Sequence, residues 1–193
     1  MNRVLPAPVV LSIQISTLFA FWSLISRATR APSGEYLELL PVAGGELTRF
    51  LTSKGSENNG QISPDGKWVT YASDESGAWE IYVTSFPGAA GKWQVSRGGG
   101  TEPRWRGDGK EIFYIAPNGM LMAVPVSGEG IFATGTPAPL FQIHGRAPIS
   151  STDVFTYDVA KDGKRFLVNR YVKPEHVAPL TILLQTAAGN SSP

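Results

Sequence analysis

The chain has 193 residues, of which 42% are hydrophobic and 10% aromatic, so it is long enough and apolar enough to bury a core and is not a disordered chain. Its 17 basic and 16 acidic residues give a formal net charge of +1, and this balance argues against nucleic acid as a partner. Cysteine is absent, which excludes disulfides, thiolate metal sites and cysteine nucleophiles.

The first segment, residues 1–30, contains 23 consecutive uncharged residues, from Val4 to Ser26. An α-helix needs about 20 apolar residues to cross a bilayer, so the segment predicts a hydrophobic N-terminal helix that anchors the chain in a membrane through residues 4–26. Two other interpretations stay open: a cleavable signal peptide, or an apolar stretch that results from a truncated or misassigned start.

Beyond residue 30, one pattern repeats: an Asp-Gly pair placed directly before an alternating apolar segment. The pair occurs at Asp65-Gly66, Asp108-Gly109 and Asp162-Gly163, with spacings of 43 and 54 residues. Asp-Gly favours a tight hairpin turn with positive φ, so these six residues are predicted to form structural turns. Repeats of about 40–50 residues are typical of propeller blades. The pattern therefore predicts an all-β chain.

These segments divide residues 31–186 into four units. We expect an incomplete blade at 31–55, in which only the last two strands are visible, full blades at 58–97 and 98–142, and a terminal blade at 150–186. The 21 glycines and 15 prolines lie between short apolar runs, as in chains with many turns. The expected fold is a partial β-propeller of about three four-stranded antiparallel blades, preceded by the N-terminal helix and followed by a disordered tail at 187–193.

Motifs between Gly60 and Phe141 resemble one known family. They are Gly60-Gln61-Ile62-Ser63-Pro64-Asp65-Gly66, Ser73-Asp74-Glu75-Ser76-Gly77, Ile81-Tyr82-Val83, Phe86-Pro87-Gly88, Trp93-Gln94-Val95-Ser96, Pro103-Arg104-Trp105 and Phe113-Tyr114. Over roughly residues 36–186 the chain resembles the TolB-like, WD-related propeller repeats of bacterial membrane-anchored serine/threonine protein kinases. The resemblance implies a membrane-anchored protein whose propeller is periplasmic or extracellular and senses or binds a partner; a secreted protein is the alternative.

No motif of catalysis or metal binding is present in the sequence. The kinase motifs, a Gly-rich loop before a strand lysine, His-Arg-Asp and Asp-Phe-Gly, are missing. Ser63, Ser73 and Ser76 lack the Gly-x-Ser-x-Gly turn of hydrolases. The two histidines, His144 and His176, have no carboxylate or cysteine at ligand spacing. We therefore predict a protein that is not an enzyme and that uses no metal and no cofactor.

Four charged residues are the candidates for partner binding. Alternation along an inner strand places Glu102 and Arg104 on one side, and the Asp74-Glu75 turn is expected on a rim. Salt bridging or solvation is the alternative role for these charges. Tryptophans at positions 68, 79, 93 and 105 recur in strands, where they either fill the space between blades or stack on a ligand.

The predicted function is a non-catalytic propeller module for protein or ligand binding and sensing. Expected partners are a protein or peptide, a second copy in a homo-oligomer, or a companion propeller chain. The alternatives are an accessory propeller fragment of a serine/threonine kinase or prolyl-oligopeptidase-like enzyme, or the remnant of a truncated gene, whose unclosed blades would expose strand edges.

Overall fold

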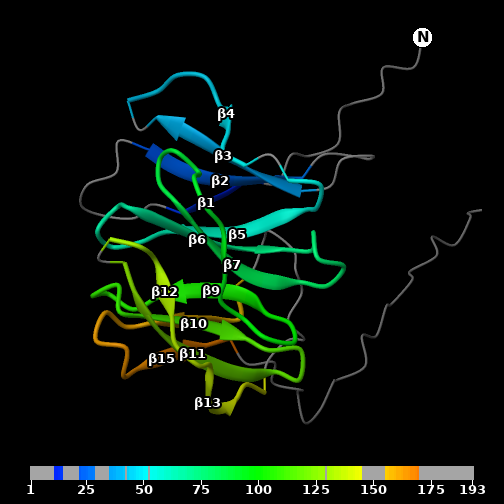
Figure 1. Cartoon of the computed structure of the whole chain (residues 1–193), viewed down its shortest axis with the longest axis vertical. Coiled ribbons are helices and arrows are strands. Elements are labelled where there is room, and N and C mark those ends of the chain that lie inside the picture. Colours follow the sequence, from blue (N-terminus) through cyan, green and yellow to red (C-terminus); the bar gives the residue numbers. More distant parts are fainter. Residues whose placement is uncertain are drawn as a thin grey trace, which may run out of the picture.

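The computed structural model describes residues 11–14, 22–28, 35–41, 43–51, 53–128, 130–144 and 155–169. These residues form four antiparallel sheets and include no helix, so this part of the chain has no helix that could span a membrane. Figure 1 shows the sheets β1–β4, β5–β8 and β9–β13 stacked in chain order along the long axis of the molecule, with β14–β15, in orange, at the height of the third sheet. We call them blade 1 (β1–β4), blade 2 (β5–β8), blade 3 (β9–β13) and blade 4 (β14–β15).

Blade 1 corrects the expected N-terminal helix. Its strands, in the order β1-β2-β3-β4, are Leu11–Gln14, Trp22–Ala28, Glu35–Pro41 and Thr48–Arg49. The helix prediction is wrong for Leu11–Gln14 and Trp22–Ala28, which pair antiparallel with each other; the rest of residues 1–30 lies outside the described residues. Apolar and polar residues alternate in Leu-Ser-Ile-Gln, which is the period of a strand. The blade that we expected to be incomplete therefore has four strands.

Blades 2 and 3 each contain one of the first two Asp-Gly turns. Blade 2 has the order β5-β6-β7-β8, with strands Glu57–Ile62, Trp68–Ser73, Glu80–Ser85 and Trp93–Gln94. Blade 3 has β9 Thr101–Trp105, β10 Glu111–Ile115, β11 Met120–Ser127, β12 Ala133–Thr134 and β13 Ala138–Gln142. Both β12 and β13 pair with β11, so the outer edge of blade 3 is divided between two short strands.

Blade 4 is described over two strands, β14 Tyr157–Val159 and β15 Phe166–Val168, which pair antiparallel around the third Asp-Gly turn. The rest of the terminal blade expected at 150–186, and the tail expected at 187–193, lie outside the described residues.

Apolar side chains from neighbouring blades form three separate cores. In β10, Ile112 and Tyr114 face blade 2, whereas Phe113 and Ile115 face blade 4. Likewise Val69 of β6 packs toward blade 1 and Ala72 packs toward blade 3. Because both faces of a central blade are buried, the sheets stack as propeller blades do, and period-two alternation alone sorts each side chain to one of two cores.

Candidate functional site

The three Asp-Gly pairs form equivalent turns, which we call the blade 2 turn (63–67), the blade 3 turn (106–110) and the blade 4 turn (160–164). Their glycines have φ values of +71°, +72° and +69°. In each turn the glycine amide donates to the carbonyl oxygen three residues earlier, over 2.8–2.9 Å. The aspartate Oδ1 accepts the amide of the lysine two residues later, over 3.0–3.2 Å. These contacts give Asp65, Asp108 and Asp162 the same local role.

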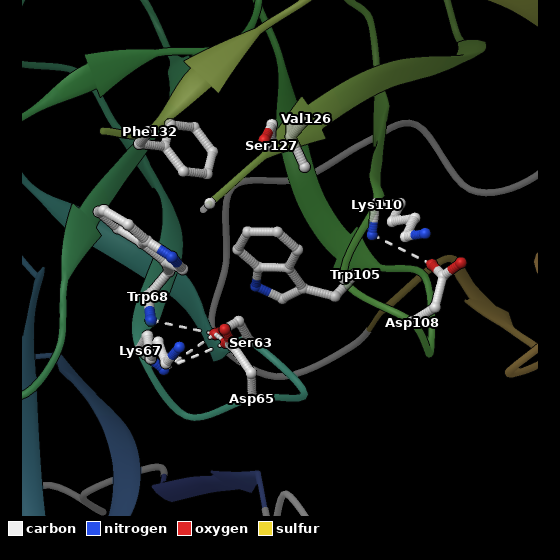
Figure 2. A pocket seen from close by; sticks show the side chains of 12 residues that line it. Ser63, Asp65, Lys67, Trp68, Trp105, Asp108, Lys110, Val126, Ser127 and Phe132 are labelled. Atoms are coloured by element: carbon white, nitrogen blue, oxygen red, sulfur yellow. Dashed lines mark hydrogen bonds between the residues drawn. The ribbon is translucent and has the colours of Figure 1, made fainter. Parts of the chain in front are cut away.

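A cavity of about 440 Å³ lies between the blade 2 turn and the blade 3 turn (Figure 2). Its polar lining residues are Ser63, Asp65, Lys67, Asp108, Lys110 and Ser127, and its large apolar lining residues are Trp68, Trp105, Val126 and Phe132. Small-molecule and peptide pockets commonly have volumes of about 300–1,000 Å³. The space is therefore large enough to admit part of a ligand.

Three packed aromatic rings form the floor of this cavity. The ring centroids of Trp68 and Phe132 are 5.0 Å apart, and those of Trp105 and Phe132 are 6.4 Å apart in an edge-on arrangement. Trp93 supports the floor, with its ring 5.4 Å from Trp68. Of the two roles that the sequence left open, the structure shows packing: Trp68 and Trp105 belong to the core between blades 2 and 3. Both also line the cavity, and stacking on a ligand stays a prediction.

The two indole N–H groups of the floor differ in their partners. Trp105 Nε1 donates to the carbonyl oxygen of Gln61 over 3.2 Å. Trp68 Nε1 is buried and has no hydrogen-bond partner in the described part of the chain. Gly128 lies beside it: a Cβ atom at position 128 would be 2.4 Å from Trp68 Nε1. A buried donor without an acceptor costs about 1–3 kcal/mol, so this position favours a ligand that brings an acceptor.

The next groove along the chain, between the blade 3 and blade 4 turns, is filled. The Gly107 amide donates to the carbonyl oxygen of Lys161 over 3.1 Å and ties the two turns together. The Arg106 side chain lies against the blade 4 turn, since a Cβ atom at Gly163 would be 2.6 Å from Arg106 Cδ. Two repeats of the same pattern therefore give one closed groove and one open groove.

Three sequence differences between repeats account for the open groove. Counting back 43 positions, Pro64 stands at the place of Gly107, and proline has no amide to make the corresponding hydrogen bond. Ser63 stands at the place of Arg106, so the side chain that fills the second groove is missing from the first. Trp68 stands at the place of Glu111 and supplies the floor.

The carboxylates beside the cavity are already engaged. Asp65 Oδ1 accepts from the Ser63 hydroxyl over 2.6 Å, and Asp108 Oδ2 accepts from Arg106 Nη2 over 2.6 Å. Desolvation raises the pKa of Asp108, but the hydrogen bonds from Arg106 and the Lys110 amide together lower that pKa below its ordinary value. Both aspartates therefore stabilise turns, and Lys67 and Lys110 lie exposed beside them.

The predicted binding residues Glu102 and Arg104 are buried, with exposed fractions of 0% and 5%. The Glu102 carboxylate accepts from the Thr156 amide over 2.6 Å and from the Thr156 hydroxyl over 2.9 Å. Arg104 stacks on Phe155, its Cζ 3.4 Å from the ring centroid, and its Nε is 3.5 Å from Asp158 Oδ1. Burial lowers the pKa of Arg104. Their described contacts join blade 3 to blade 4.

The other predicted pair, Asp74 and Glu75, follows β6, whereas the blade 2 turn precedes that strand, so the pair lies at the opposite end of the blade from the cavity. Asp74 Oδ1 accepts the Ser56 amide over 2.7 Å, and Glu75 forms an ion pair with Lys92. The four predicted binding residues therefore do not form one site: Glu102 and Arg104 lie between blades 3 and 4, and Asp74 and Glu75 lie at one end of blade 2. Among the described residues no cluster of His, Asp and Glu could hold a metal ion.

Sequence reasoning missed the cavity because it interpreted each turn and each tryptophan separately. Gly128 and Phe132 fall in a loop to which no function was assigned from the sequence. The available signal was the difference between aligned repeats, above all Pro64 against Gly107 and Trp68 against Glu111.

No protein-family model and no curated protein matches the chain. Among solved structures, a protein from Agrobacterium tumefaciens assigned as TolB has a TM-score of 0.53 at 18% identity, over 76% of this chain and 60% of that one. TolB from Acinetobacter baumannii has a TM-score of 0.53 at 17% identity, over 75% of this chain and 34% of that one. The fold is therefore that of a TolB-like β-propeller, and the chain spans less than two thirds of the length of these neighbours.

Proposed function

We propose that this protein is a non-catalytic propeller module that binds a segment of a partner protein in the cavity between the blade 2 and blade 3 turns. The observation that carries the proposal is the contrast between grooves: this one is open over an aromatic floor, while the equivalent groove beside it is filled by Arg106. A generic gap between repeats would be expected at both places.

The chemistry of the lining supports binding over catalysis. Ser63 Oγ donates to Asp65 and accepts the amides of Lys67 and Trp68, over 3.2 Å and 3.0 Å, so the hydroxyl is occupied within the turn. Nucleophilic catalysis requires a general base beside the hydroxyl, and the group beside this one is a carboxylate that also accepts a backbone amide. The lining offers recognition groups and no assembled reactive pair.

A peptide fits this lining better than a sugar does. Sugars are bound by open aromatic faces and by carboxylates that accept from hydroxyl groups, but Trp68 and Trp105 are each only 8% exposed. Both oxygens of Asp108 already accept hydrogen bonds from the protein. Aromatic side chains with little exposed surface suit the insertion of one apolar side chain from a peptide.

The finer expectations of the sequence analysis stay predictions. They are the association with a kinase or peptidase chain, the extracytoplasmic location, and pairing with a second copy or companion propeller. The resemblance to kinase-linked propellers motivates the kinase association and the location, and the strand edges of unclosed blades motivate the pairing. Fractionation of the native cells with an antibody to this chain would test the location.

The experiment is selection of random linear peptides displayed on phage against the full chain, followed by affinity measurement with the selected peptides. Gly128→Ala places a methyl group 2.4 Å from Trp68 Nε1. Because the added methyl group changes the cavity wall beside Trp68, we expect peptide affinity to fall by roughly fivefold or more, which corresponds to about 1 kcal/mol of binding free energy. Gly88→Ala is the matched control, because a Cβ atom there meets nothing within 4 Å and Gly88 does not line the cavity.

Selected peptides that bind wild type and Gly128→Ala with equal affinity would overturn the proposed site, provided near-ultraviolet circular dichroism shows that both proteins are folded. Failure to select any peptide would overturn the proposed function itself.

A further inference from the structure

We infer that the ligand segment inserts one apolar side chain above Trp105 and Phe132 and places a neutral carbonyl oxygen on the indole N–H of Trp68. This inference rests on the proposed function and defines the chemistry that the same cavity recognises: a peptide unit with an apolar side chain.

Of the two indole N–H donors in the floor, one lacks a partner in the part of the chain that the structure describes, so the ligand needs to bring one acceptor. Trp105 Nε1 is occupied by the Gln61 carbonyl oxygen, while Trp68 Nε1 is buried without a partner among the described residues. Trp68 is itself more than nine-tenths buried, so its ring cannot turn outward to reach water without leaving the core. Since no described residue accepts from this donor, an acceptor brought into the cavity would satisfy it.

Gly128 packs closely against this donor, and any side chain at position 128 would collide with the indole. Position 128 lines the cavity, and a Cβ atom there would lie 2.4 Å from Nε1 and 3.1 Å from Cδ1 of Trp68. Figure 2 shows the indole nitrogen of Trp68 on the side of its ring that faces Trp105. An acceptor at this place therefore lies directly beside the aromatic floor that holds the apolar side chain.

The acceptor is expected to be uncharged. A carboxylate moved from water to an apolar site needs a cationic partner or several donors, and the floor offers one neutral N–H between Trp68, Trp105 and Phe132. A peptide carbonyl needs only one donor. The exposed ammonium groups of Lys67 and Lys110 lie at the mouth, where a carboxylate of the ligand remains solvated.

The test uses N-acetyl-L-leucinamide as the probe and the ¹⁵N-labelled full chain. We expect the probe to move one indole N–H resonance, which is identified as Trp68 by its loss in Trp68→Phe. Trp68→Phe keeps an aromatic ring but removes the donor, and one neutral hydrogen bond corresponds to a roughly twofold to tenfold loss of probe affinity. Trp79→Phe is the control, because Trp79 packs against the same core but does not line the cavity.

Equal probe affinity in wild type and Trp68→Phe would overturn the inference while leaving the proposed function in place, since peptides selected on phage would still bind at the cavity. A Trp68 resonance that moves with methyl α-glucopyranoside and not with N-acetyl-L-leucinamide would also overturn it. Loss of affinity in Trp68→Phe with unchanged affinity in Trp79→Phe supports it, and a thermal melt of both variants confirms that each is folded.

Discussion

Glu102 is predicted to hold blade 4 to blade 3, and its replacement by alanine is expected to weaken that junction. The side chain is fully buried, and its carboxylate accepts both the amide and the hydroxyl of Thr156, which is itself 4% exposed. Glu102→Ala leaves two buried donors unpaired at about 1–3 kcal/mol each. Since the variant also relieves the burial of a carboxylate, the net loss of unfolding free energy is expected to be about 2–4 kcal/mol.

Glu102→Gln is the matched variant and is expected to cost only about 1 kcal/mol. Its amide oxygen can accept the Thr156 amide, and its NH₂ group can donate to the Thr156 hydroxyl oxygen, so only the charge assistance is lost. Urea denaturation gives both free energies, and hydrogen exchange at the Thr156 amide reports on the junction itself. A Glu102→Ala protein that loses less than about 1 kcal/mol, with unchanged exchange at Thr156, would refute this reasoning.

Two further predictions concern a turn and a buried acid. Gly163→Ala is expected to lower the melting temperature more than Gly66→Ala does. Both glycines have a similar positive φ, but only a Cβ atom at position 163 collides with a side chain, that of Arg106, 2.6 Å away. Equal losses of melting temperature would contradict the packing of the groove between the blade 3 and blade 4 turns. Burial raises the pKa of Glu57, so its contribution to stability is present below pH 4.5 and is lost as the pH rises through the folded pKa. The melting temperature of Glu57→Gln relative to wild type should therefore rise between about pH 4 and pH 8; a constant difference would argue against it.

The strands around the Asp-Gly turns were predictable because local chemistry sets them. Asp65-Gly66 and Asp108-Gly109 demand positive φ, and the segments that follow alternate between two cores, as in Trp68–Ser73 and Glu111–Ile115. The start of the chain was mispredicted because its uncharged run of 23 residues is long enough for a membrane helix. The length rule ignores the polar residues that alternate with apolar ones in Leu11–Gln14, as they do in a strand. It also takes no account of the neighbouring strand β3, with which β2 pairs, while β1 pairs with β2.

The candidate site was harder to predict because it depends on how two repeats meet. Pro64 and Trp68 are ordinary residues for a turn and a strand when each is viewed alone. Their consequence appears only beside the next blade, where Pro64 leaves out the hydrogen bond that Gly107 makes and Trp68 meets Phe132 across the groove. Conversely, Glu102 and Arg104 drew attention as charged residues, although their contacts across blades 3 and 4 bury them.

Photo-cross-linking with the N-acetyl amide of photo-leucine, followed by mass-spectrometric mapping on the full chain, tests the central claim most directly. The account predicts cross-links to Trp68, Trp105 or Phe132, competed by N-acetyl-L-leucinamide and reduced in Gly128→Ala. Cross-links that fall instead at the Asp74-Glu75 end of blade 2, or that persist unchanged in Gly128→Ala, would contradict it.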